Sequence, residues 1–283
     1  MTWHQIFLLS TGAFIIPSSS NARDNFAINI ENTYRAWEQK QSLSQRKKDF
    51  VRVLCWRLWK ENYHILCTRL ALLNVIRKTR NKKLLTSKEK LFLKQACKYY
   101  KVSNWKYLID RMDVVPISMA IAQSIQECGW GKSLGCVRKN SYFGMTKGNV
   151  CYKYDTPEQS VRAYVRTLNT HKGYETFRAK RRIMRERRQD LLGRTLVQEL
   201  NTYCTDPKYP KIIHYIVQKY RLSVFDLMVG SVHRSMVVNQ TRYQKEKEFR
   251  AHCCTLAQRP EGVKILAHAL WIEIYQNFSK LFI

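Results

Sequence analysis

The sequence predicts a mainly α-helical protein, of class α or α+β, with one small β-hairpin. Only 10 glycines and 6 prolines occur in 283 residues, so the chain has few of the turns that a strand-rich fold requires. Apolar residues in most segments recur at spacings of three and four, the period of an amphipathic helix. Residues 140–155, NSYFGMTKGNVCYKYD, break this period with glycines and tyrosines, which predicts the hairpin.

Charge and hydrophobicity narrow the class of protein. The hydrophobic share of 45% argues against wholesale disorder, and the length allows one large or two modest domains. The net charge of +29 is not confined to one tail, and it favours an anionic polymer as partner: nucleic acid, anionic lipid or cell-wall material. Charge alone does not choose among these. The densest basic run, residues 178–188, is most simply a solvated helix face.

The cysteines predict free thiols rather than a metal site. No CxxC occurs and no Cys/His set has zinc spacing, so we expect no structural metal, and nothing indicates a cofactor. The odd count argues against a fully paired disulfide framework. One bridge among Cys128, Cys136, Cys151 and Cys204 is the alternative. The nine cysteines stand at positions 55, 67, 97, 128, 136, 151, 204, 253 and 254.

The N-terminus has features of an export signal. Residues 6–16, IFLLSTGAFII, have the length of a signal-peptide apolar core, and Ser20-Asn21-Ala22 fits a cleavage site. The apolar stretch is too short to span a bilayer, and no Lys or Arg precedes it. We expect residues 1–22 to act as a weak export signal. A buried helix or a misplaced start codon are the alternatives.

Helix signals then follow in order along the chain. Residues 23–85 predict a polar, basic helical extension. Thr86 and Glu89 have capping-box spacing, which predicts a helix through LFLKQACKYYKV. Pro116 suits the first position of the next helix, which keeps an apolar stripe up to Cys128, and Gly129 supplies a left-handed stop.

Glu127 stands on the last turn of that helix, at the edge of its apolar stripe. A carboxyl there is partly desolvated, which raises its pKa and suits it to protonate a leaving oxygen in glycoside cleavage. Trp130 offers a platform for a sugar face, and Tyr142 and Phe143 offer apolar walls. The alternative is a plain helix-end acid, although the negative end of the helix dipole disfavours one.

The segments after Phe143 predict a hairpin and two more helices. The hairpin turns at Lys147-Gly148-Asn149, and Thr156-Pro157-Glu158-Gln159 begins a helix. Asp206-Pro207 precedes a helix whose apolar face includes Tyr209. Residues 229–283 form a basic and amphipathic tail. Its last part, residues 262–283, is a packing helix, a membrane-surface helix or a partner-binding segment.

A second catalytic acid is harder to identify. Asp155 and Glu158 are the nearest candidates after the hairpin, but both also suit the first turn of a helix, where acids stabilise the dipole. Tyr203, before Asp206, has the chemistry to hydrogen-bond a developing charge. A core tyrosine is its other interpretation.

Four motifs, taken in order, resemble the bacterial glucosaminidase domain of glycoside hydrolase family 73. The resemblance covers residues 86–228, and within it the lead-in LTSKEK to RMDVVPISMA and the stretch LNTHKGY are most similar to the Bax-type proteins. Four motifs in one order are more specific than any one alone. They are AIAQSIQECGWGKS, NSYFGM, YDTPEQSVRAYVRTLNTHKGYETFR and NTYCTDPKY.

The resemblance implies a lysozyme-like fold and an endo-β-N-acetylglucosaminidase-like activity on peptidoglycan. The bond cut would be the β-1,4 bond between N-acetylglucosamine and N-acetylmuramic acid. Glu127 occupies the family's general-acid position, and Tyr203 matches the tyrosine of its Tyr-x-Thr-Asp-Pro motif. Gln123 joins Trp130, Tyr142 and Phe143 as an expected substrate-binding residue.

The chain also departs from the family pattern. Cys128 stands where Ser is usual, and Ser141 replaces the usual Asn before the aromatic-Phe-Gly step. The hairpin carries no acid before Asp155, which favours one acid acting with a water or with the substrate's own N-acetyl oxygen.

We therefore expect a peptidoglycan hydrolase exported to the periplasm or cell envelope. Its expected partners are glycan strands and anionic envelope polymers, with membrane contact through the C-terminal amphipathic segment and no specific nucleic acid. The rivals are a wall-binding scaffold without turnover and, less favoured, a basic nucleic-acid binder. No recognised nucleic-acid motif supports the latter.

Overall fold

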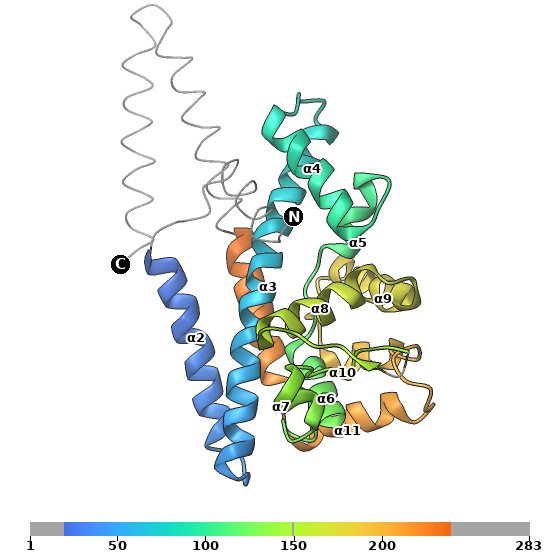
Figure 1. Ribbon diagram of the computed structural model, residues 1–283. Coiled ribbons are helices and arrows are strands. Elements are labelled where there is room, and N and C mark those ends of the chain that lie inside the picture. Colours follow the sequence, from blue (N-terminus) through green and yellow to red (C-terminus); the bar gives the residue numbers. More distant parts are fainter. Residues whose placement is uncertain (1–19, 149, 239–283) are drawn as a thin grey trace, which may run out of the picture. The chain divides into compact units, whose positions relative to one another are not determined.

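The computed structural model describes residues 20–148 and 150–238, which are mostly helical (Figure 1). Within these ranges the only sheet is a two-stranded antiparallel hairpin that pairs Thr146 with Cys151. The predicted mainly α fold with a small β element is therefore confirmed. The elements, in order, are α2 (Ser20–Glu38), α3 (Gln45–Arg80), α4 (Ser87–Tyr100), η1 (Trp105–Tyr107), α5 (Leu108–Arg111), α6 (Ile117–Cys128), α7 (Leu134–Lys139), β1 (Thr146–Lys147), β2 (Val150–Cys151), α8 (Pro157–Thr170), η2 (Lys172–Tyr174), α9 (Glu175–Glu186), α10 (Gly193–Leu196), η3 (Val197–Glu199) and α11 (Tyr209–Lys219), and residues 224–238 are also helical.

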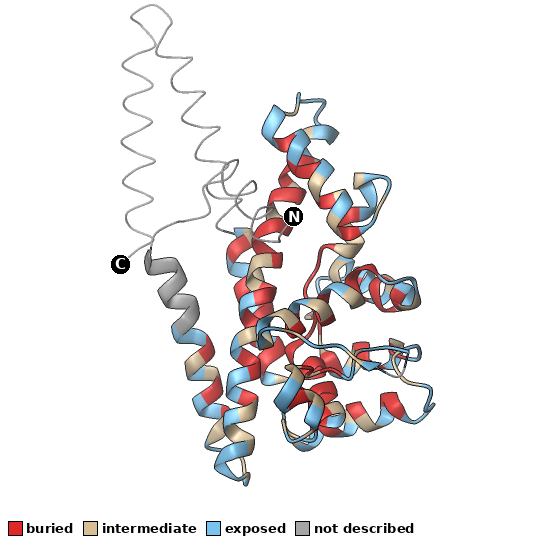
Figure 2. Cartoon of the chain, in the orientation of Figure 1, coloured by how far each residue is buried: buried red, intermediate tan, exposed pale blue. Residues whose placement is uncertain are grey.

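Helix α6 forms the centre of the core. Ten of its 12 residues are buried, against α3, α10 and α11 (Figure 2). A helix surrounded on all sides needs small or apolar residues around its whole circumference, and ISMAIAQSIQEC supplies them. Only Gln126 and Glu127, on the last turn, are not buried. The one carboxylate of α6 therefore stands where the helix leaves the core.

The N-terminal helices belong to the same compact unit as the rest of the described chain up to Val232. Helix α3 packs against both α6 and α8, and its residues Leu58 and Leu72 have no exposed surface. The predicted helical extension over residues 23–85 thus shares a core with the segment after residue 86. Residues 1–19 and 239–283, which include most of the predicted export signal and tail, lie outside the described residues.

Several helices begin or end at the residues that the capping signals of the sequence predict. Thr86 and Glu89 form the predicted capping box, and the Thr156 side chain accepts a hydrogen bond from the Gln159 amide at the start of α8. Gly129 ends α6 in the left-handed region at φ 56°. Pro116 differs from the prediction by one position: it lies just outside the helix, which begins at Ile117.

The basic run at residues 178–188 is solvated only in part: Lys180, Arg182, Arg187 and Arg188 are exposed, as its composition predicts, but two of its arginines are buried. Arg178 and Arg181 are 5% and 1% exposed, respectively. Their guanidinium groups donate to backbone carbonyls, for example Arg181 to Val114 at 2.9 Å and Arg178 to His171 at 2.9 Å. A buried charge is tolerable when its donors are satisfied, and carbonyls presented by loops supply that satisfaction here.

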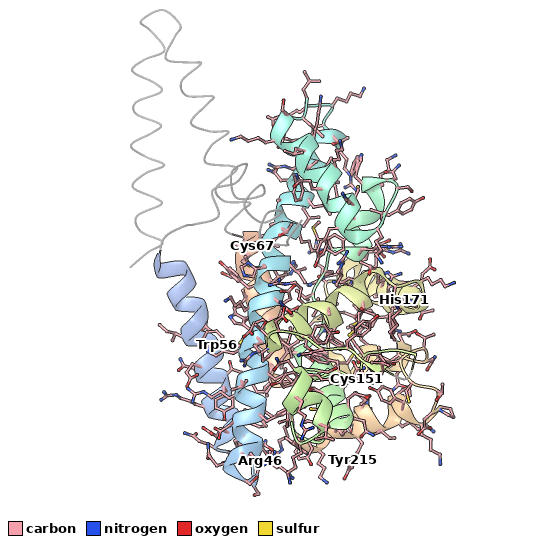
Figure 3. The ribbon with its side chains drawn as sticks, in the orientation of Figure 1. Arg46, Trp56, Cys67, Cys151, His171 and Tyr215 are labelled. Carbon is pink, nitrogen blue, oxygen red and sulfur yellow. The ribbon has the colours of Figure 1, made fainter. Side chains whose placement is uncertain are left out.

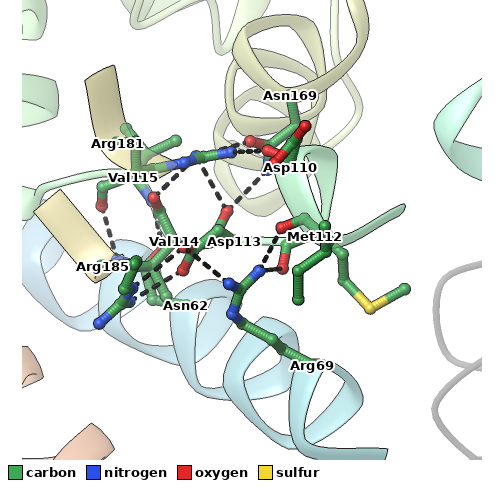
Figure 4. Close-up of polar contacts among 11 residues, drawn as sticks. Asn62, Arg69, Asp110, Met112, Asp113, Val114, Val115, Asn169, Arg181 and Arg185 are labelled. Atoms are coloured by element: carbon green, nitrogen blue, oxygen red, sulfur yellow. Dashed lines mark hydrogen bonds and ion pairs between the residues drawn. The ribbon is translucent and has the colours of Figure 1, made fainter. Parts of the chain in front are cut away.

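Two arginines, Arg69 and Arg185, pair with the buried carboxylate of Asp113, and a third, Arg181, binds its backbone carbonyl (Figure 4). Arg185 binds it in a bidentate manner, at 2.8 Å to Oδ1 and 3.1 Å to Oδ2, and Arg69 lies 3.6 Å from Oδ2. Arg181 contributes its charge and bonds the backbone carbonyl of Asp113 at 3.2 Å. Burial opposes ionisation of Asp113, but the arginines outweigh it and hold the pKa of this carboxyl well below its usual range.

Further polar contacts hold the start of α6. Asn62 on α3 exchanges two hydrogen bonds with the backbone of Val115, at 2.8 and 3.1 Å. Asp226 accepts from the backbone amides of Ser118 and Gly193 at 2.9 and 2.8 Å, although burial raises the pKa of Asp226 to about 6. Partners from distant parts of the chain thus fix the position of α6.

The described cysteines are all free thiols, as the sequence predicts. Cys128 and Cys136 lie in hydrogen-bond contact with each other, and the backbone amide of Gly131 donates to the Cys128 sulfur at 3.3 Å. In the part of the chain that the structure describes, no helix combines the length and apolar character that crossing a bilayer demands.

Replacing Asp113 tests the buried ion cluster. Asp113→Asn keeps the shape but leaves the arginines without their counter-charge, so we expect a loss of about 3–5 kcal/mol in the free energy of unfolding. Because the folded pKa of Asp113 is depressed, the wild-type advantage is full above the unfolded pKa, roughly 4, and declines as pH falls below it.

Urea unfolding at pH 7 and at pH 3 measures both effects. Glu186→Gln is the matched control, since Glu186 pairs with Arg182 at 3.7 Å on the surface, and it should leave stability unchanged. A neutral result for Asp113→Asn at pH 7 would contradict a stabilising role.

Candidate active site

Glu127 lies at the boundary between the core and solvent. Two left-handed residues follow Gly129, Trp130 at φ 61° and Gly131 at φ 79°, so the chain turns sharply as soon as α6 ends. The Glu127 side chain is half-buried as a result. This matches the predicted placement of a carboxyl that is desolvated but reachable.

The electrostatics of Glu127 suit a proton donor. Burial raises the pKa of its carboxyl, and a hydrogen bond from the Tyr209 hydroxyl to Oε1, at 2.8 Å, acts in the opposite direction. Burial is the larger effect, so Glu127 keeps its proton to a higher pH than an exposed glutamate does.

A chain of buried hydrogen bonds leads to this carboxyl from the core. The Tyr164 hydroxyl donates to Gln123 Oε1 at 2.7 Å, and Gln123 Nε2 donates to the Tyr209 hydroxyl at 3.2 Å. The amide nitrogen of Gln123 can only donate a hydrogen bond, so the Tyr209 hydroxyl oxygen accepts this bond and its own proton remains free to be donated elsewhere. The Tyr209 proton is therefore directed to Glu127.

The Phe143-Gly144 step passes directly against the same carboxyl. Gly144 has φ 60°, and a Cβ atom at this position would overlap Glu127 Oε2. Position 144 therefore requires glycine for two reasons: its backbone is left-handed, and a larger side chain would occupy the space that the Glu127 carboxylate fills. The backbone covers one side of Glu127 at this point.

Tyr203 contacts the residues that surround Glu127. Its hydroxyl donates to the Phe143 carbonyl at 2.6 Å, and its ring stacks on Tyr209 with centroids 5.4 Å apart and an interplanar angle of 12°. It therefore contacts both groups that flank Glu127. No direct hydrogen bond joins Tyr203 to Glu127 among the described residues.

Two predicted substrate-binding residues turn out to be core residues. Gln123 has no exposed surface, and Phe143 is 1% exposed with its ring stacked on Tyr164 at 4.0 Å between centroids. Direct contact of either side chain with a glycan is therefore wrong for this structure. Both act on the site indirectly, Gln123 through Tyr209 and Phe143 through its carbonyl.

Trp130 and Tyr142 are partly exposed, and both lie close to Phe50 from α3. Their ring centroids are 6.0 and 6.4 Å from that of Phe50, and Trp130 also meets Tyr220 edge-on at 4.9 Å. Arg46, at the start of α3 (Figure 3), donates to the Trp130 carbonyl at 2.8 Å. Sugar stacking by these two rings stays a prediction.

The candidate second acids have local partners. Asp155 accepts from Gln159 Nε2 at 3.1 Å, and Glu158 pairs with Arg57 at 2.8 Å. Neither has a described contact with Glu127. Their positions at the start of α8 agree with the helix-end interpretation, so neither gains support as a catalytic group.

Sequence reasoning missed Tyr209 and Gly144, which contact Glu127, and Tyr164, which acts on it through Gln123 and Tyr209. Tyr209 has the spacing of an ordinary core tyrosine on α11, and Tyr164 has the same spacing on α8. Gly144 carried a weak signal, since a glycine in a segment expected to be extended can mark a site where another group approaches the backbone closely. Across residues 20–148 and 150–238, no group of three or more His, Cys, Asp or Glu side chains has the arrangement of a metal site.

Comparison with known proteins places this site in a family. Residues 102–222 match the glucosaminidase family model, described as mannosyl-glycoprotein endo-beta-N-acetylglucosaminidase. The chain is 29% identical over 182 residues to Protein bax of Escherichia coli (strain K12), covering 58% of this chain and 65% of that protein. The chain thus spans slightly less than two thirds of that curated relative, and no solved structure matches it significantly. Residues 102–222, which contain Glu127, Tyr203 and Tyr209, therefore match a glucosaminidase-family domain, and the chain is similar to Protein bax.

Proposed function

We propose that this protein is a peptidoglycan hydrolase in which Glu127 is the general acid. The glucosaminidase match supports a glycan-cleaving hydrolase in general. The observation that carries the finer proposal is the directed hydrogen-bond chain from Tyr164 through Gln123 and Tyr209, which ends on a half-buried carboxyl with a raised pKa. The proposed substrate is the β-1,4 bond between N-acetylglucosamine and N-acetylmuramic acid.

The two oxygens of Glu127 take different parts in the proposed reaction. Oε1 accepts the Tyr209 hydrogen bond, which leaves Oε2, beside Gly144, to carry the acidic proton. Transfer of that proton to the glycosidic oxygen breaks the bond as an oxocarbenium-like state develops on the sugar. The Tyr209 hydroxyl then stabilises the carboxylate that remains.

The nucleophile in this proposal is a water or the N-acetyl oxygen of the substrate. Both Asp155 and Glu158 are bound to local partners, which supports a mechanism with a single protein acid. Tyr203 acts as a positioning residue, because it holds the Phe143 carbonyl and stacks on Tyr209.

The envelope is the proposed place of action. Peptidoglycan is an anionic polymer, and the formal net charge of +29 favours retention on it. Such retention weakens with rising salt. A signal within residues 1–22, of which residues 1–19 lie outside the described range, and membrane contact through residues 262–283, which lie wholly outside it, remain proposals.

A wall-binding protein without turnover is the second candidate. The lack of a described second acid beside Glu127 favours it. This candidate sediments with peptidoglycan and releases no fragments, whereas the hydrolase releases muropeptides with new reducing ends. Mass spectrometry of those ends also identifies which bond is cut.

Glu127→Gln tests the general acid. We expect the release of reducing ends from purified peptidoglycan to fall by about 10²–10⁴-fold, because the amide cannot supply the proton. Glu158→Gln removes a nearby exposed acid and should retain activity. Equal activity of Glu127→Gln and wild type would show that Glu127 is not the general acid.

Tyr209→Phe tests the hydrogen bond on Oε1. Removing a donor to the carboxylate disfavours its charged form, so the pKa of Glu127 should rise further above its usual value. The alkaline limb of the kcat/KM profile should shift to higher pH, and a carbon-13 NMR titration of Glu127 should show the same shift. Tyr215→Phe, an exposed tyrosine on the same helix, is the control. An unchanged or lower pKa for Glu127 would contradict the proposed contact.

Gly144→Ala tests the close approach of the backbone to Glu127. A Cβ atom there displaces the carboxylate, and a displacement of about 1 Å is enough to reduce kcat roughly 10²-fold. Gly148→Ala has the same left-handed strain, at φ 58°, but meets nothing within 4 Å, so it should retain kcat. If both variants lose activity equally, backbone strain rather than contact with Glu127 explains the effect.

A further inference from the structure

A second site candidate is a cavity of ≈ 360 Å³ formed by residues of η1, α5 and α9 and by the loop that follows α4. Its lining shares no residue with the Glu127 hydrogen-bond chain. The volume is within the range of small-molecule sites. Polar and charged side chains dominate it, namely Lys101, Ser103, Tyr107, Arg111, Arg178 and Arg182, together with the acids Asp110 and Glu175.

The charge of the lining is positive. Four cations face two carboxylates, so the formal balance is +2. Asp110 Oδ2 pairs with Arg182 at 3.0 Å, so these two charges offset each other and three cations remain beside Glu175. The cavity therefore favours an anionic ligand.

Two of the guanidinium groups are held rigidly by the backbone. Arg111 Nη1 donates to the carbonyls of Tyr100, Lys101 and Thr170 at 2.9–3.1 Å. Arg178 Nη1 donates to the carbonyls of Leu168 and His171 at 3.0 and 2.9 Å. All these bonds use Nη1, so the Nε and Nη2 groups of both arginines have no acceptor among the described residues.

The two arginines also repel each other. Burial lowers the pKa of Arg178, and the charge of Arg111 lowers it further, while Glu175 and Asp110 act in the opposite direction. Arg178 is 5% exposed, so water screens this repulsion poorly. An anion between the guanidinium groups would relieve the repulsion and accept the unused N–H groups.

We propose that this cavity binds an oxyanion, a carboxylate or phosphate group carried by a larger ligand. The planar guanidinium group of an arginine can donate two parallel hydrogen bonds to two oxygens of such a group. Because Arg111 and Arg178 are already held in place, less side-chain entropy is lost on binding. Lys101, which directly follows α4, and Arg182 on α9 are both exposed and complete the basic lining. The site is independent of glycan cleavage, so its test does not depend on Glu127.

Binding of two probes to the full chain tests the proposal and distinguishes the ligand source. Inorganic phosphate represents a phosphate group, and N-acetyl-D-alanyl-D-alanine represents a peptide carboxylate, with its C-terminal amide as the uncharged control. We expect millimolar binding of at least one acid probe by isothermal titration calorimetry, and none of the amide. The probe that binds more tightly shows whether the natural ligand presents a phosphate group or a peptide carboxylate.

The variant Lys101→Gln/Arg182→Gln should weaken this binding at least tenfold. The matched control Lys94→Gln/Lys180→Gln removes the same charge from exposed positions of α4 and α9 that do not line the cavity, and it should bind as wild type does. All four positions are exposed, so folding should be preserved, and circular dichroism checks this. No binding of either acid, or equal weakening in both variants, would overturn the proposal.

Discussion

The buried ion cluster around Asp113 is the constraint on which the rest of the structure depends. It joins α3, through Arg69, to α9, through Arg185, across the loop that leads into α6. Arg181 on the same side binds the carbonyls of Asp113 and Val114. Because α6 begins three residues after Val114 and runs straight to Glu127, the orientation of the catalytic candidate is set at a distance by charges that never contact it.

The second organising feature is a line of polar groups through an apolar core. Tyr164, Gln123 and Tyr209 satisfy one another and leave one proton directed at Glu127. A buried network of this kind is stabilising when each member is satisfied, and it specifies a single arrangement of the side chains. The site is therefore preorganised by α6, α8 and α11 together, which fits the family match over residues 102–222.

Local features of this structure could be read from the sequence, whereas contacts between distant residues could not. The caps at Thr86 and Thr156 and the left-handed stop at Gly129 depend on neighbouring residues and were predicted correctly. Arg181 was expected at the surface because its carbonyl partners lie about 70 residues earlier in the chain. The contact of Tyr209 with Glu127 could not be predicted, because the two residues are 82 positions apart in the sequence. Glu127 itself was found through the resemblance more than through its spacing.

The burial of basic side chains changes what the composition implies about polymer binding. Arg69, Arg178 and Arg181 count toward the formal charge of +29, but they are 7%, 5% and 1% exposed. Side chains enclosed in this way cannot touch an anionic strand and displace the counterions condensed on it. The number of ions released on association is therefore set by the outer lysines and arginines alone, and is smaller than the sequence total implies.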